Sequence, residues 1–223
     1  MKKIGEWYFH DEEKAQSFLG YAKGIQPYEN DLFRKYWKAV SRLSDKRVAI
    51  DVGANYGFVT RWLCQSFDMT YASEVVPQTR ECLKKNVESQ GMPNVQVLDY
   101  GFSDQNKNLD VFFKPSWSGH ASTIRNSASG GKSYSCPVKT IDSCNFENVD
   151  FIKIDVEGQE LSVLRGALST ISKWKPMISF EVSFGDPDGL ARSWNTHQFM
   201  LALNYKFILT AKRDYFYIYD EEK

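Results

Sequence analysis

A short apolar run that breaks into two glycines constrains this chain more than any other stretch. Residues 48–52 are apolar apart from Asp51 and suit a buried parallel strand. Gly53 and Gly57 follow within a polar turn, and a helical pattern resumes at residue 58. Glycine lets the main chain approach a ligand closely, and the first N–H groups of a helix are unpaired. The stretch is therefore predicted to cradle a nucleotide-type cofactor.

The glycine spacing separates two cofactors that use such a turn. A dinucleotide fingerprint reads G-x-G-x-x-G, whereas here Gly53 and Gly57 bracket Ala-Asn-Tyr and no third glycine follows. The next predicted strand ends in Glu74, close to the offset of about 20 residues at which an acid binds ribose hydroxyls. The pattern favours S-adenosylmethionine (SAM) over NAD. For the glycine pair alone, an ordinary strand-to-helix turn is the alternative.

Composition bounds the class of protein. The chain has 223 residues, with 28 Lys and Arg against 28 Asp and Glu, which gives a formal net charge of zero. A neutral chain does not favour nonspecific binding to nucleic acid, so no such partner is expected. The four cysteines show neither C-x-x-C nor metal-ligand spacing, which indicates reduced thiols in a cytoplasmic protein. Neither a signal peptide nor a membrane span is predicted, so no membrane partner is expected.

The chain is predicted to divide into a helical N-terminal extension, residues 1–46, and a catalytic domain, residues 47–223. In the extension, apolar residues recur at 32, 33, 36, 37, 40 and 43, with basic residues on the other face, which predicts a helix over residues 31–43. This helix either packs on the main domain or forms a lid over the substrate pocket.

Beyond the glycine turn, strands and helices alternate. This order predicts an α/β fold with a mostly parallel sheet, helices on both faces, and an antiparallel strand from a C-terminal hairpin. Residues 109–113 alternate and suit a peripheral strand or an accessory hairpin. Residues 114–135 show no pattern, which is typical of a functional or disordered loop. The predicted strands are 69–74, 94–98, 149–154, 175–182, 205–209 and 215–219, and the predicted helices are 78–90, 161–171 and 193–203.

A second group of charged residues follows the predicted strand at 149–154. Its members are Lys153, Asp155, Glu157 and Glu160. They cluster at the carboxyl end of a core strand, where open α/β sheets bind their ligands. Gathered acids are costly unless they serve a ligand, a cation or a helix N-terminus, so a functional role is favoured. The alternative is that two of them only favour the start of the next helix through its dipole.

Together these motifs resemble the FkbM-type SAM-dependent methyltransferases, over roughly residues 47–220. The string Lys-x-Asp-x-Glu-Gly-x-Glu at 153–160 is far more specific than the glycine turn, and one departure is Val75 where the family pattern usually has proline. The resemblance implies a Rossmann-like class I methyltransferase with a seven-stranded sheet, which methylates a hydroxyl on a sugar, glycan or other small molecule. The other residues that carry it are Asp51, Gly53, Ala54, Asn55, Gly57, Glu74, Pro77, Asn86, Asp142, Gly166 and Glu181.

The predicted SAM site follows the ends of successive strands. The methionyl end is assigned to the glycine turn, the ribose to Glu74, and the adenine to the segment that follows the third strand. Asp155 lies nearest the expected methyl group. The cofactor-binding residues are thus predicted to be Asp51, Gly53, Asn55, Gly57, Glu74, Val75, Asp99, Gly101, Phe102 and Asp155.

The acceptor side needs a group that orients the hydroxyl and takes up its proton. Asp155 is the first candidate, and Glu157, Glu181 and His120 are weaker ones. No metal ligand is predicted: Asp155, Glu157 and Glu181 offer oxygens that suit a divalent cation, but their spacing does not indicate one.

Three other classes compete with this prediction. A methyltransferase for exocyclic amines of bases typically carries [DNS]-P-P-[YFW] at the strand of Asp155, whereas this chain has Asp-Val-Glu-Gly. A non-catalytic SAM-binding module or regulatory subunit is the principal alternative, and the presence of both acid-rich motifs argues against it. A dehydrogenase is a more distant one.

Overall fold

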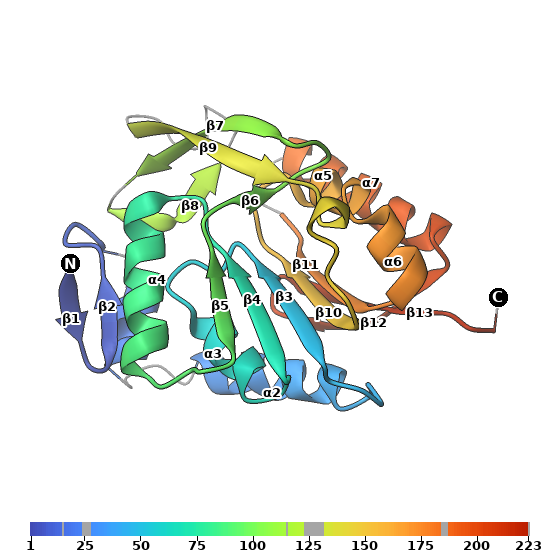
Figure 1. The fold of residues 1–223 in the computed structure, drawn as a ribbon, viewed down its shortest axis with the longest axis horizontal. Helices are drawn as coiled ribbons and strands as arrows, with labels where there is room; N and C mark the ends of the chain where they lie inside the picture. Colours follow the sequence, from blue (N-terminus) through green and yellow to red (C-terminus); the bar gives the residue numbers. More distant parts are fainter. Residues whose placement is uncertain (15, 24–27, 115, 123–131, 184–186, 223) are drawn as a thin grey trace.

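The computed structural model describes residues 1–14, 16–23, 28–114, 116–122, 132–183 and 187–222. A seven-stranded sheet in the order β12-β13-β11-β10-β3-β4-β5 forms its centre (Figure 1). Strand β13 is antiparallel to both neighbours, and the other adjacent pairs are parallel, as predicted. The strands are β3 (Val48–Val52), β4 (Met69–Ser73), β5 (Val95–Leu98), β10 (Val149–Ile154), β11 (Met177–Glu181), β12 (Tyr205–Ala211) and β13 (Asp214–Tyr219).

Helices cover both faces of the sheet (Figure 1), as predicted. On one face, Tyr36 and Leu63 pack against Phe151. On the other, Leu164 and Met200 pack against a core that includes Ile152. Neighbouring residues of one strand, 151 and 152, thus face opposite layers, as the period of two requires. The first face carries α2 (Tyr28–Val40), α3 (Phe58–Cys64) and α4 (Pro77–Ser89); the second carries α5 (Glu160–Arg165), α6 (Leu168–Trp174) and α7 (Pro187–Ala202).

The N-terminal extension is only partly helical. Helices α1 (Gln16–Ala22) and α2 confirm part of the prediction, but the first nine residues form an antiparallel hairpin of β1 (Lys2–Ile4) and β2 (Trp7–Phe9). Three-residue strands are too short to show a clear alternation, so the helical prediction was wrong there. Helix α2 packs on the sheet through buried residues, which is the first of its two predicted placements.

A second sheet lies beyond the carboxyl end of the third core strand. Its order is β6-β9-β7-β8, and β7 confirms the predicted accessory strand. The absence of structure predicted for residues 114–135 is wrong for β8 and for the first half of β9, whose Ser-rich and Gly-containing sequences lack a strand pattern. Residues 115 and 123–131 lie outside the described part of the chain. The strands are β6 (Gly101–Phe102), β7 (Lys107–Lys114), β8 (Trp117–Ser122) and β9 (Lys132–Lys139).

The predicted helix at 161–171 is two helices, α5 and α6, which meet at Gly166. A Cβ atom on Gly166 would lie 2.0 Å from the carbonyl oxygen of Ser103, so glycine allows the close approach of these segments. Asp142 lies in the short 3-10 helix η2 (Asp142–Cys144) and accepts hydrogen bonds from the amides of Ser169 (2.9 Å) and Thr170 (2.8 Å). Asp142 therefore caps the start of α6.

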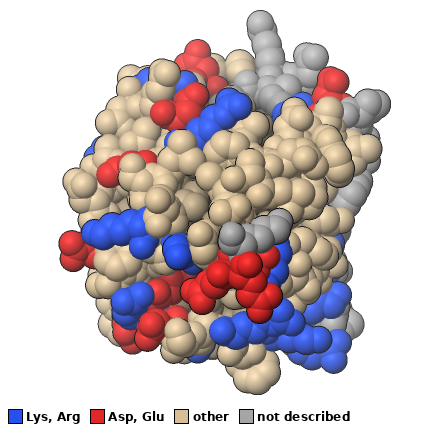
Figure 2. All heavy atoms as spheres, turned by 90° about the vertical axis from the view of Figure 1, so that its right-hand side faces the viewer, with Lys and Arg blue, Asp and Glu red and all other residues tan. Residues whose placement is uncertain are grey.

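The surface agrees with a neutral composition. Figure 2 shows acidic and basic side chains interspersed among large uncharged areas on the face that it presents. Across the described residues, the helices are each too short or too polar to cross a lipid bilayer.

Candidate active site

The glycine turn after β3 packs directly against the end of β10. Positive φ angles occur at Gly53 (79°), Asn55 (52°) and Gly57 (95°). A Cβ atom on Gly53 would lie 1.8 Å from the carbonyl oxygen of Asp155. Only glycine fits there, and the close approach places the turn beside the leading catalytic candidate. The strand order reverses between β3 and β10, which is where open α/β sheets bind ligands.

Glu74, at the end of β4, holds the other side of the turn. Its Oε2 accepts a hydrogen bond from the amide of Asn55 (3.0 Å), and its Oε1 accepts one from the amide of Val76 (2.8 Å). The residue is 6% exposed, and burial raises the pKa of its carboxyl group to about 7. A carboxylate has about four acceptor positions, so two remain for a ligand.

Asp51 lies beneath the turn in a buried ion pair. Its Oδ1 is 3.1 Å from Lys153 Nζ, and its Oδ2 accepts a hydrogen bond from Thr60 (2.6 Å). Lys153 Nζ also donates to the carbonyl oxygen of Gly53 (2.8 Å) and lies 3.5 Å from Asp155 Oδ2. Burial lowers the pKa of Lys153, but the two carboxylates outweigh it and leave that pKa above its usual range. The predicted cofactor residue Asp51 thus supports the turn through Lys153.

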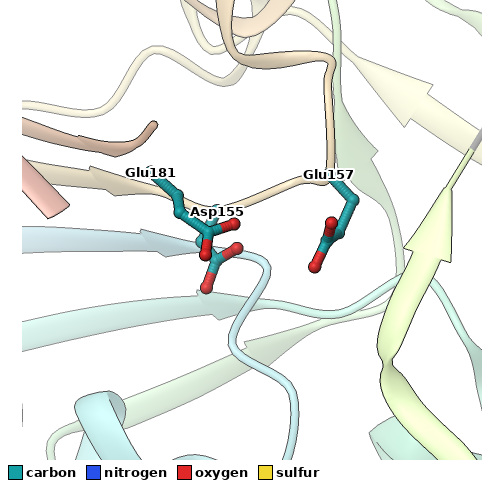
Figure 3. Close-up of side chains that lie close together, drawn as sticks. All are labelled: Asp155, Glu157 and Glu181. Atoms are coloured by element: carbon teal, nitrogen blue, oxygen red, sulfur yellow. The ribbon is translucent and has the colours of Figure 1, made fainter. Parts of the chain in front are cut away.

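Asp155, Glu157 and Glu181 come together at the ends of β10 and β11. Their carboxylate oxygens lie within 4.8 Å of one another, and Figure 3 shows the three side chains around one space. Glu157 has a φ of 50° and is followed by Gly158 at 103°. The structure thus brings three of the candidate acceptor-side residues together in one acid cluster (Asp155, Glu157 and Glu181). Such oxygens could also hold a divalent cation, and this is the one group of that kind among the described residues.

The last acid of the motif, Glu160, has a different role. Glu160 Oε1 accepts hydrogen bonds from the amides of Gly158 (3.0 Å) and Val156 (3.4 Å) at the start of α5. The alternative role at a helix start therefore applies to Glu160 and not to Glu157, whose side chain faces the acid cluster.

Two acids of the cluster have raised pKa values, and the third lies beside a buried lysine. Burial and the charge of Asp155 raise the pKa of Glu157 to about 8, and burial and both neighbouring acids raise that of Glu181 to about 10. Arg213 Nε lies 3.2 Å from Glu181 Oε1 and opposes the second shift. At neutral pH the two glutamates therefore hold protons, while Asp155 is the member that faces Lys153.

This arrangement predicts a stability change. The pKa of Glu181 is raised in the folded protein. The free energy of unfolding therefore falls as the pH rises from 4.5, the usual pKa of a glutamate, towards about 10. We expect Glu181→Gln to raise the melting temperature at pH 8 by roughly 2–4 °C, because the amide, unlike the carboxyl group, need not take up a proton on folding, and to raise it less at pH 5. Thermal melts in EDTA, with the exposed Glu222→Gln as control, measure this. A gain that shrinks as the pH rises would contradict it.

Of the residues predicted for the adenine side, one is exposed and two are buried. Asp99 is exposed, and Gly101 packs so closely that a Cβ atom would lie 2.4 Å from Val75 Cγ1. The ring of Phe102 is 4% exposed and contacts Tyr100 and Phe146 within the core. Any contact between Phe102 and a ligand would therefore come from its main chain. His120 falls on β8, and its side chain lies outside the described part.

Sequence reasoning missed the contribution of the C-terminal hairpin. Asp214 pairs with Glu181 in the sheet register and accepts a hydrogen bond from the hydroxyl of the buried Tyr36 (2.8 Å). Burial and Asp155 raise the pKa of Asp214 to about 6. Because β12 is parallel to β11, the turn that carries Arg213 reaches the same edge as Glu181. The charged turn between two predicted strands was the available signal.

The fold and the site together define a Rossmann-like methyltransferase. The model of the methyltransferase FkbM domain matches residues 51–215, and the chain belongs to this family of SAM-dependent methyltransferases. A search of curated protein sequences gives no match.

Solved structures agree on the fold. The FkbM methyltransferase from Methylobacillus flagellatus KT is 20% identical with a TM-score of 0.59; the match covers 95% of this chain and 50% of that one. This chain thus spans half the length of that protein. Precorrin 8W decarboxylase from Methanobacterium thermoautotrophicum is 13% identical (TM-score 0.56; 98% and 99% covered). A putative methyltransferase from Streptococcus mutans, in complex with S-adenosylhomocysteine (SAH), is also 13% identical (TM-score 0.53; 82% and 94% covered).

Proposed function

We propose that this protein transfers a methyl group from SAM to a hydroxyl oxygen on a sugar, a glycan or another uncharged small molecule. One observation carries the proposal: the glycine turn touches Asp155, so a cofactor on the turn would end beside the acid cluster. The four cysteines are free thiols, which supports the predicted cytoplasmic location.

The residues at the ends of β3 and β4 fit SAM. The turn has positive φ angles at Gly53, Asn55 and Gly57, as expected of a cofactor-binding glycine turn, and Glu74 keeps acceptor capacity for two ribose hydroxyls. When bound, SAM would supply an electrophilic methyl group. The protein must then position the acceptor oxygen and take up its proton.

The acid cluster supplies the acceptor side of this chemistry. Asp155 would accept the hydroxyl proton, and Lys153 holds its carboxylate in place at 3.5 Å. Glu157 and Glu181, as protonated groups, would donate hydrogen bonds to further hydroxyls of the acceptor. An anionic acceptor would be repelled by the charge of Asp155, and Lys153, the lysine beside Asp155, is shared with Asp51. We therefore favour neutral polyhydroxylated acceptors.

The test is methyl transfer from radiolabelled SAM to matched acceptor pairs. We expect labelled product with neutral glycosides and at least about tenfold less with the corresponding uronic acids, whose carboxylate adds repulsion. The reactions are run with EDTA and with added Mg²⁺, which separates a cation-dependent enzyme from a cation-free one. Tight SAH binding without product on any hydroxylated acceptor would favour the non-catalytic SAM-binding module.

Cofactor binding is expected to depend on pH through Glu74. Its pKa of about 7 means that the carboxyl group of the free protein takes up a proton below that pH. Ribose hydroxyls donate to the carboxylate, so the affinity for SAH should fall below pH 7, by up to about tenfold for each pH unit. Calorimetry at pH 6, 7 and 8 measures this. Glu74→Gln should bind more weakly at pH 8 and lose the pH dependence; an unchanged profile would rule out the ribose role.

A further inference from the structure

The N-terminal strap, residues 1–14, lies outside the matched family domain yet contacts the cofactor turn. It contains the hairpin β1–β2, which lies beside α4 (Figure 1), and the segment that follows it. At its far end the amide of Lys14 donates to the carbonyl oxygen of Ser116, next to β8. The strap therefore runs from the outer side of the turn to the accessory sheet.

A buried side-chain amide makes the first connection between the strap and the turn. Asn86, on α4, is fully buried. Its Oδ1 accepts a hydrogen bond from the amide of Tyr8 (2.6 Å), and its Nδ2 donates to the carbonyl oxygens of Tyr8 (3.1 Å) and Tyr56 (2.9 Å). Tyr56 lies inside the turn, between Asn55 and Gly57. Asn86 thus ties strand β2 and the turn to the same helix.

A buried carboxylate makes the second connection. Glu13 is 0% exposed, and its Oε2 accepts a hydrogen bond from the hydroxyl of the fully buried Tyr56 (2.9 Å). Lys2 Nζ donates to the carbonyl oxygen of Glu13 (2.6 Å), and the ring of Phe9 packs edge-on against Tyr56 at 4.8 Å. This buried hydrogen bond and the ring contact together join the strap to the glycine turn.

The turn needs such support because of its backbone. Asn55 adopts a positive φ of 52°, a region that residues other than glycine rarely occupy, and its amide must point at Glu74. Glu74 holds the amide of Asn55 and Lys153 holds the carbonyl oxygen of Gly53. Tyr56 adds an anchor from the side of the strap.

We propose that Glu13 is a positioning residue for cofactor binding: through Tyr56 it holds the glycine turn in the shape that accepts SAM. The strap is then part of the cofactor site. This inference rests on the proposed function, because it takes the glycine turn as the SAM site.

The test compares SAH binding and steady-state kinetics in strap variants. We expect Glu13→Leu and Tyr56→Phe each to weaken SAH binding by about tenfold or more. The double variant should bind no worse than the more weakly binding single variant, because each single variant already removes the same contact. The Michaelis constant for SAM should rise while that for the acceptor stays unchanged. Glu13→Gln retains an acceptor oxygen and should restore binding.

Controls separate this role from simple stability. Glu12→Leu makes the same change at the exposed neighbouring position and should leave binding unchanged. Hydrogen exchange without cofactor should show faster exchange of the amides at 53–57 in Glu13→Leu, with β10 unchanged. Variants that melt earlier but bind SAH as the wild type does, or whose turn stays protected, would overturn the proposal. Wild-type protein that does not bind SAH would instead refute the proposed function, and the exchange result would still decide whether the strap holds the turn.

Discussion

Asp155→Asn should lower the turnover number for methyl transfer by about 10²–10⁴-fold, the range that general bases contribute. The amide has nearly the same shape and can still accept a hydrogen bond from Lys153, 3.5 Å away in the wild type. It cannot take up the hydroxyl proton. The affinity for SAH should change little, because the turn meets Asp155 through its main chain. Turnover and SAH binding, measured on the same preparation, separate the two effects.

A matched control sharpens this test. The exposed Asp68→Asn makes the same chemical change away from the site and should behave as the wild type. An Asp155→Asn variant with wild-type turnover would place the base elsewhere, and Glu157→Gln would be tested next.

The sequence predicted the parts of the site that lie on local patterns. The glycine turn, Glu74 and the Lys-x-Asp-x-Glu string each follow a strand whose apolar run is easy to recognise. Parallel strands end at one edge of a sheet, and there the structure brings Asp155 and Glu181 together.

Partners that depend on long-range packing could not be predicted. Glu13 meets Tyr56, and Asp214 meets Tyr36, across 43 and 178 residues of sequence. No periodicity marks either contact, since each arises from where a strand or helix is placed in three dimensions. Strand β8 and the first half of β9 were missed for a related reason: their polar sequences do not show the alternation that identifies a strand.

The buried charges beneath the turn predict the largest loss of stability. Lys153 is 4% exposed and Asp51 is 0% exposed, so their ion pair has little contact with water. Lys153→Met keeps the length of the side chain but leaves Asp51 with an uncompensated charge beside Asp155. Breaking a buried pair from one side costs roughly 3–5 kcal/mol, which corresponds to a fall in melting temperature of about 6–20 °C.

Two further variants decide whether charge is the cause. Lys153→Met with Asp51→Asn removes the stranded charge and should recover a large part of the lost stability, because removing both partners of a buried pair costs less than removing one. Lys206→Met breaks an exposed pair with Asp220 at 2.7 Å and should leave the melting temperature almost unchanged. If the double variant were no more stable than Lys153→Met, lost packing would be the cause. Recovery of stability without recovery of SAH binding would show that this ion pair holds the turn in shape as well as keeping the protein folded.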